Sequence, residues 1–465
     1  MSDATDAMAS NSPTSSTAEL RPSGRTSPLP ISDRIEGVDF ARGIALLGIL
    51  LVNMRFFFWP FSEALSPTPT IEGIDRSGLD IAAWALIESL CTFKFISLFS
   101  ILFGFGVAVQ VARATSSGAS KWRIGVRRMG FLACIGFVHA LLIWYGDILV
   151  VYSVAGVILL AISSWSVGAL RRAFWIIAIA MTSLTLLVSV ATALFVSAFP
   201  DPAAEVVPAV TAESATEAAA TTPPDATAIA EPNAPLRGLD AIMASGGQLF
   251  GSPVWVTGET LAYRDGPLLD AICFRAASWA IASLSGIFGW GWSVLMMMAF
   301  GMFAMRSGLF QRDPDAAARR TRIITIGLCI GLPSAAISVG GTLILESDSV
   351  IAAAMHTLFL QLSAIALPPA YACLAVEWAP RFARSLARPI ESAGRMALTI
   401  YLCESLACTG AAYWWGLGFF GRLSEALLFA TACIVWGILV VFAHFWLARF
   451  SMGPMERLWR AVTYA

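Results

Sequence analysis

Long apolar runs recur along the chain, separated by short polar segments. The first covers residues 38–59 (VDFARGIALLGILLVNMRFFFW), and the second covers 94–112, preceded by an amphipathic stretch at 79–93. A helix needs about 20 mostly apolar residues to cross about 30 Å of hydrocarbon. The pattern predicts an all-α membrane protein, a polytopic bundle of about ten transmembrane helices. The later spans are expected at 129–145, 148–165, 173–198, 280–305, 323–345, 353–376, 396–415 and 425–448.

Composition agrees with a membrane protein. Of the 465 residues, 57% are hydrophobic and only 13% are charged. An outer-membrane barrel would show segments of about ten residues with alternating polarity, whereas these runs are continuously apolar. The formal net charge of -1 argues against a nucleic-acid binder. The eight cysteines lie inside apolar runs without CxxC spacing, so neither a metal site nor a disulfide framework is expected.

Basic residues flank alternate spans. Cytoplasmic loops carry an excess of Lys and Arg, and here the clusters precede the first span and follow every even-numbered span. The loops between them are acidic or neutral. We therefore expect a multi-pass protein of the bacterial inner membrane with both termini in the cytoplasm. The main clusters are Arg25 and Arg34, Arg113 to Arg128, Arg171 and Arg172, Arg306 to Arg322, Arg381 to Arg395, and Arg449 to Arg460.

The spans divide the chain into four parts. Residues 1–33 are rich in Ser, Thr and Pro and are expected to form a disordered cytoplasmic tail. Residues 34–198 hold helices one to five, and 269–465 hold helices six to ten. The periplasmic loop at 199–268 has a low-complexity first half. Its second half carries aromatic residues, so it is expected either to lie over the outer mouth as a lid or to pack as an ordinary loop.

The first span carries three polar residues on one face. Asp39, Arg42 and Asn53 are spaced by three and eleven residues, which brings them close together on a helical wheel. Arg42 is one turn inside the apolar run. It is expected to pair with Asp39 or reach the headgroups, or else to bind an anionic ligand group.

The third span contains His139, followed eight residues later by Asp147 at the turn into the fourth span. A neutral histidine inside a bundle is suited to act as a general base, and a carboxylate would orient it. The alternative is a histidine that is hydrogen-bonded to a neighbouring helix.

Three further ionisable residues are candidate ligands for substrate, because such groups are costly within a membrane. Lys94 opens the second span, His356 lies at the outer end of the eighth, and Glu404 lies in the middle of the ninth. The alternative for Lys94 is to snorkel to the membrane surface, and for His356 and Glu404 it is packing or hydrogen bonding within the bundle. No Walker loop, dinucleotide fingerprint, HExxH or GxSxG is present, so the interior polar residues are expected to converge on one cavity that opens to the outer leaflet.

Four separated motifs carry a resemblance to a known family. RIEGVDFARGIALLGILLVNM, KFISLFSILFGFGVAV, GFVHALLIWYGDILVVYSVAG and the closing GRMALTIYLCES with FSMGPMERLWRAVTYA look like the YeiB-like bacterial inner-membrane family, domain of unknown function 418. The resemblance covers residues 34–465 outside the low-complexity loop, and it implies that 269–465 carry the family's C-terminal domain. The first motif is also remotely similar to transmembrane acyltransferases that modify glycans, including the heparan glucosaminide acetyltransferase group.

That remote similarity implies a membrane acyltransferase acting on an envelope glycan or lipid. His139 would be the base, Asp147 would orient it, and Arg42 with Lys94 would hold anionic donor groups; the catalytic histidine of those relatives does not align with His139. No permanently bound cofactor is expected, and the donor would be an acyl-CoA or an acyl lipid. The alternative is a small-solute transporter or transport-associated protein in which Glu404 carries a proton. Membrane lipids are expected partners, and an oligomer is left open.

Overall fold

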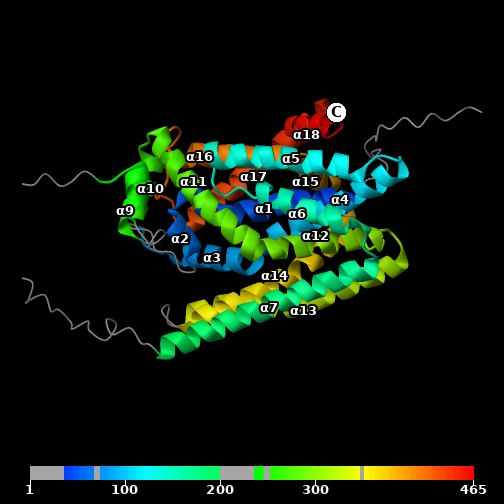
Figure 1. Cartoon of the computed structure of the whole chain (residues 1–465), viewed down its shortest axis with the longest axis horizontal. Helices are drawn as coiled ribbons and strands as arrows, with labels where there is room; N and C mark the ends of the chain where they lie inside the picture. The colour runs from blue at the N-terminus through cyan, green and yellow to red at the C-terminus, as the bar shows by residue number, and fades with distance from the viewer. Residues whose placement is uncertain (1–35, 67–73, 199–234, 246–251, 346–349, 465) are drawn as a thin grey trace, which may run out of the picture.

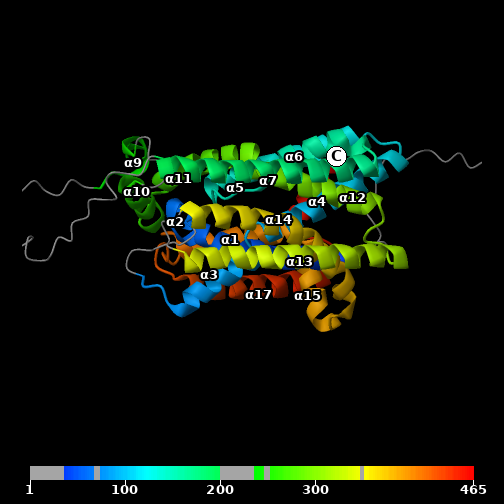
Figure 2. The same ribbon diagram turned by 90° about the horizontal axis from the view of Figure 1, so that it is seen from below.

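Every regular element in the described part of the chain is helical, and the long helices run along the longest axis of the molecule in both views (Figure 1 and Figure 2). Within the described residues, eight helical segments are long and apolar enough to cross a membrane. The predicted tail and the low-complexity half of the loop lie outside the described residues. The computed structural model describes residues 36–66, 74–198, 235–245, 252–345 and 350–464.

The helices follow one another with short connections. In chain order they are α1 (Glu36–Phe58), α2 (Phe61–Leu65), α3 (Gly78–Leu90), α4 (Lys94–Ser116), α5 (Lys121–Leu142), α6 (Leu149–Ala161), η2 (Ile162–Ser164), α7 (Val167–Ala198), α9 (Gly238–Ala244), α10 (Pro253–Arg264), α11 (Leu268–Ser285), η3 (Gly286–Trp290), α12 (Gly291–Arg306), α13 (Pro314–Ile344), α14 (Val350–Trp378), η4 (Ala379–Arg381), α15 (Arg384–Arg395), α16 (Ala397–Ala412), α17 (Glu425–Arg449) and α18 (Pro454–Tyr464).

Several helices begin earlier than their apolar runs. The third span was expected from 129, but α5 begins at Lys121; the seventh was expected from 323, but α13 begins at Pro314. Both extensions are rich in basic residues. Arg and Lys are good helix formers whose long stems reach polar surroundings, so a helix continues past the point where its hydropathy falls.

One predicted boundary is confirmed and another is wrong. The amphipathic stretch at 79–93 and the span at 94–112 correspond to α3 and α4, which are separated by a break at Cys91–Phe93 and together make one candidate crossing, Gly78–Ser116. Phe93 there has a φ of 61°, a left-handed backbone that interrupts a helix. The sixth span was expected at 280–305, but the helix begins at Leu268 and continues through the π turn η3 into α12.

Two predicted spans correspond to helices that are shorter than a typical crossing. Residues 148–165 contain α6 with η2, and residues 396–415 contain α16. The count of ten crossings therefore stays a prediction. The described chain starts and finishes near the end of the bundle that carries the basic loops, which is on the right in Figure 1.

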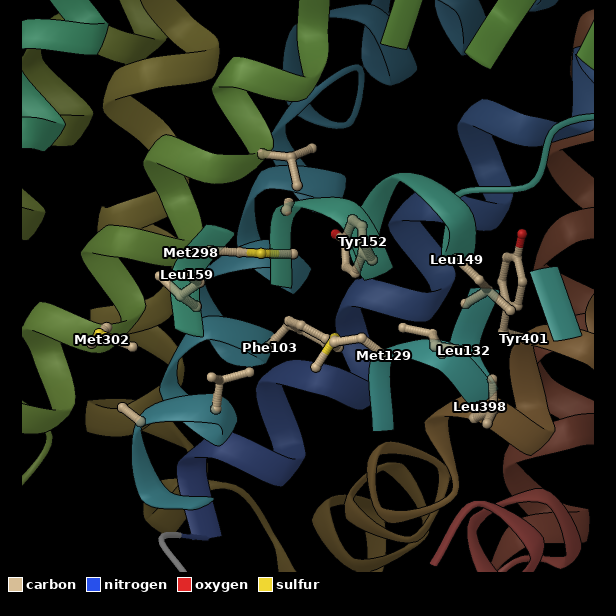
Figure 3. Packing of buried hydrophobic residues seen from close by; sticks show 14 of the residues in the cluster. Phe103, Met129, Leu132, Leu149, Tyr152, Leu159, Met298, Met302, Leu398 and Tyr401 are labelled. Carbon is tan, nitrogen blue, oxygen red and sulfur yellow. The ribbon is translucent and has the colours of Figure 1, made fainter. Parts of the chain in front are cut away.

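Close helix packing at the centre depends on glycine. A Cβ on Gly104 of α4 would overlap the Met298 backbone of α12, and a Cβ on Gly301 of α12 would overlap the Ile101 carbonyl of α4. Small residues of this kind let membrane helices approach closely. This α4–α12 contact holds one side of the core in which Phe103, Tyr152 and Met298 pack (Figure 3).

The second half of the predicted periplasmic loop packs as part of the core. Helices α9 and α10 cover the end of the bundle opposite the basic loops, and Trp255 and Tyr263 of α10 are fully buried. Tyr263 stacks on Tyr413 with ring centroids 4.6 Å apart. The segment therefore matches the packed-loop alternative.

Candidate active site

A cavity of about 200 Å³ lies inside the bundle. Its wall comes from α1, α4, α5, α6, α15, α16 and α18, which are far apart in the sequence. Figure 3 shows part of this wall, where Leu132, Leu149, Leu398 and Tyr401 face one another. The charged residues of the wall are Arg42, Arg128, Arg395 and Glu456, and the aromatic ones are Phe99, Phe103, Tyr152, Tyr401 and Trp459.

His139 lies one side-chain layer behind this wall. It is in the last turn of α5 and is 1% exposed. Its ring centroid is 5.2 Å from that of Tyr401, which lines the cavity. On the other side its ring is 6.2 Å from Trp144, which belongs to the packed aromatic cluster at the covered end. His139 therefore lies between the cavity and that cluster.

The histidine is oriented by Asp147. His139 Nδ1 is 3.1 Å from Asp147 Oδ1, and both side chains are buried. Asp147 Oδ2 accepts a hydrogen bond of 3.0 Å from the Val150 backbone at the start of α6. His139 Nε2 has no hydrogen-bond partner among the described residues. A carboxylate on Nδ1 fixes the ring and leaves Nε2 as the nitrogen that can exchange a proton.

A glycine makes room for this pair. A Cβ on Gly136, one turn before His139, would meet Asp147 Oδ2 at 2.6 Å. The turn at 143–148 can therefore fold back against α5 and bring Asp147 beside the ring.

Arg42 lines the cavity and also pairs with Asp39 at 2.8 Å. Pairing with Asp39 and binding an anionic ligand group in the cavity are therefore compatible in space. Leu46 and Ile49 line the cavity one and two turns further along α1. Asn53 continues this helical face one turn beyond Ile49, outside the cavity wall.

Lys94 and His356 lie in a separate polar cluster at the break between α3 and α4. Lys94 Nζ donates a 2.8 Å hydrogen bond to the Glu88 carbonyl in the last turn of α3. It therefore satisfies a backbone carbonyl that has no intrahelical partner because the helix ends there. His356 Nε2 is 3.6 Å from Glu88 Oε1, and its Nδ1 is 3.1 Å from Ser338 Oγ. The expectation that all polar residues converge on one cavity is therefore not met for these two.

Glu404 lies on α16, three residues after Tyr401, and is 2% exposed. Its Oε1 has no hydrogen-bond partner among the described residues, and Glu404 does not line the cavity. The structure thus groups His139, Asp147 and Arg42 at or beside the cavity, with Asn53 and Glu404 near it.

Among the wall residues that sequence reasoning missed, three come together beside one another: Arg128, Glu456 and Trp459. Arg128 was counted only as a topology signal. Glu456 accepts hydrogen bonds from the backbone of Leu398 and Thr399 at 2.8 and 3.0 Å, so it caps the start of α16. The amphipathic character of residues 454–464 was the available signal that α18 lies on the bundle rather than in solvent.

Comparisons with known proteins now decide the family. The family model described as "Protein of unknown function (DUF418)" matches residues 304–465, which include α16 and α18 of the cavity wall. The uncharacterized protein YeiB of Escherichia coli strain K12 is 30% identical over 431 residues, covering 92% of this chain and 95% of that protein. The chain belongs to the YeiB-like DUF418 family.

A second relative comes from another bacterium. The uncharacterized protein YxaH of Bacillus subtilis strain 168 is 28% identical over 440 residues, covering 94% of this chain and 96% of that protein. Because both YeiB-like relatives match over almost their whole length, the similarity includes the regions of His139 and Asp147 as well as the DUF418 segment.

Proposed function

We propose that this protein is a transmembrane acyltransferase of the bacterial inner membrane that modifies an envelope glycan or lipid. The observation that carries the proposal is the His139–Asp147 pair beside the cavity, with Nε2 free of partners among the described residues. A buried imidazole held by a carboxylate is the arrangement that general-base catalysis requires.

The chemistry follows from these positions. His139 Nε2 takes the proton from a hydroxyl or amine of the acceptor while its oxygen or nitrogen attacks the carbonyl carbon of the donor. The new C–O or C–N bond forms, the C–S or C–O bond to the donor's carrier breaks, and the imidazolium returns the proton to the leaving group. Asp147 keeps Nδ1 protonated and stabilises the imidazolium.

The position of His139 suits transfer across the membrane. The cavity is lined by the basic residues Arg42, Arg128 and Arg395 as well as by Tyr401, and His139 lies just beyond Tyr401. A donor in the cavity and an acceptor from the covered end would meet at this ring. Rotation of Tyr401 is needed for contact, because its side chain separates His139 from the cavity.

Mass spectrometry of envelope lipids and glycans tests the proposal. A deletion strain should lose an acyl modification that the wild-type gene and His444→Ala restore and His139→Ala does not. His444, on α17, is the matched control because it is only partly buried and lies outside the cavity wall. Identical acylation in the deletion and wild-type strains would contradict the proposal, and an accumulating small solute would favour transport instead.

A further inference from the structure

Arg128 is the least compensated charge in the cavity wall. Its guanidinium lies 4.4 Å from the Trp459 ring centroid and 5.5 Å from that of Phe103, so the cation is held between two aromatic rings. Nη1 donates to Gln110 Oε1, whereas Nε is buried without a partner among the described residues. Gln110 Nε2 is a second buried donor without a described partner.

The acidic groups nearby are engaged elsewhere. Glu456 receives the backbone donors of Leu398 and Thr399 and the Thr399 hydroxyl, and Asp39 pairs with Arg42. Arg128 forms no salt bridge with any residue of the described part of the chain. Arg128 is half-buried, and a partly desolvated cation with unsatisfied buried donors is costly, so this part of the wall favours a ligand that brings acceptor oxygens and negative charge.

An anchor for membrane headgroups is the alternative reading of Arg128. Against it, Arg123 on the same helix is exposed and is the residue placed to reach the surface. Arg128 instead lines the cavity, and α18 is held over it by the hydrogen bond of 3.2 Å from Trp459 Nε1 to the Arg128 carbonyl. The aromatic clamp fixes the guanidinium toward the interior.

Apart from Arg42, Arg395 and Glu456, the rest of the wall is mostly apolar. Leu46, Phe99, Leu132 and Leu149 line the same cavity as Arg128 and Tyr401, and Tyr401 is the side chain that contacts His139. A ligand that fits this wall has an anionic, oxygen-rich head and a mostly apolar extension.

We propose that the cavity binds a phosphate-bearing acyl donor, with its phosphate on Arg128 beside Trp459 and its acyl ester or thioester directed toward Tyr401. An acyl-CoA and an acidic phospholipid share this chemistry. That the ligand is an acyl donor rests on the proposed function. Binding of a phosphate-bearing ligand at Arg128 does not depend on catalysis. Arg guanidinium is well suited to phosphate because its planar array of donors matches the oxygens.

Calorimetric titration of the purified full-length protein with octanoyl-CoA tests the first source, and native mass spectrometry for retained phosphatidylglycerol tests the second. Arg128→Gln should weaken binding of one probe about tenfold or more, since a charge-assisted hydrogen bond is lost. The matched control Arg127→Gln, next to it on α5 but outside the cavity wall, should stay within about twofold of wild type. Leu132→Phe, which fills the cavity without touching the charge, should also weaken binding.

Arg128→Lys is the control for an intact fold, because the substituted side chain keeps the positive charge at this position. Octanoyl-CoA binding that depends on Arg128 identifies a soluble donor, and Arg128-dependent retention of phosphatidylglycerol alone identifies a lipid donor. Equal behaviour of Arg128→Gln and Arg127→Gln toward both probes would overturn the inference. If Arg128-dependent binding is found but acylation does not need His139, the proposed function fails and the binding site stands.

Discussion

Two histidines lie beside a carboxylate inside this bundle, and they differ in what surrounds them. His139 is 3.1 Å from Asp147 and next to the cavity wall, with Nε2 left without a described partner. His356 is bounded on both nitrogens, by Ser338 on Nδ1 and by Glu88 at 3.6 Å from Nε2. Both are buried, so burial alone does not separate a reactive histidine from a structural one.

The two histidines differ in whether Nε2 has a neighbouring partner among the described residues and in whether a cavity lies next to the ring. Glu88, Lys94 and His356 close the break between α3 and α4, where backbone groups would otherwise be unsatisfied in a membrane. Within the described residues, the one backbone group that the His139–Asp147 pair satisfies is the Val150 N–H, which donates to Asp147. Polar groups that exceed what folding requires are the ones that point to chemistry.

The largest expected effect separates the two histidines by activity. His139→Ala should lower acyl transfer about 10²–10⁴-fold, the usual contribution of a general base. His356→Ala should leave the rate per folded molecule within about threefold of wild type. Transfer of a labelled octanoyl group by the purified variants measures both, and equal losses would remove the distinction.

Asp147→Asn should act through His139. We expect kcat to fall about 100-fold, because the imidazole loses the carboxylate that orients it, while octanoyl-CoA affinity is unchanged. Glu88→Gln is the matched control and should not lower kcat. A change confined to KM in Asp147→Asn would contradict a positioning role.

Lys94→Met should affect stability rather than catalysis. Removing the ammonium leaves the Glu88 carbonyl in the last turn of α3 without its hydrogen-bond donor, at a cost of about 2 kcal/mol in the free energy of unfolding. Thermal unfolding in detergent measures the loss. A Lys94→Met protein that is stable but inactive would mean that Lys94 belongs to the functional site after all.

Glu259 of α10 is a buried carboxyl group that, unlike Asp147, is not paired with a histidine. Burial raises its pKa to about 7, against hydrogen bonds from the Phe61 backbone and Trp255 Nε1 that lower it. Between pH 4.5, the ordinary pKa of a glutamate side chain, and about pH 7, the folded protein therefore keeps a proton on Glu259 that the unfolded chain loses.

Stability should consequently fall as pH rises through this window, and it should stay lower above pH 7. Glu259→Gln should flatten the dependence, while Glu63→Gln on the partly exposed face of α2 should keep it. The melting temperature measured from about pH 5 to about pH 8 checks this, with an expected difference smaller than that of Lys94→Met. A flat wild-type profile would show that Glu259 has a cation or water that lowers its pKa.

Hydrophobic runs predicted most of the fold because a membrane helix depends mainly on its own residues. They placed the break before Lys94, but they failed where a helix continues beyond its apolar run: basic residues prolong α5 and α13, and α11 begins at Leu268, ahead of the expected sixth span. Spacing along the chain suggested His139 with Asp147, because both flank one turn. It could not separate Lys94 and His356 from them, nor bring in Arg128 and Trp459, because those positions depend on packing between distant helices.

A cryo-electron microscopy structure of the full-length protein in nanodiscs with octanoyl-CoA would show whether an acyl donor reaches His139. We expect ligand density between Arg128 and Tyr401, with the thioester carbonyl beside Tyr401 and the Tyr401 ring moved so that His139 Nε2 faces the cavity. Density only on the outer surface of the bundle, with Tyr401 still covering His139, would contradict it.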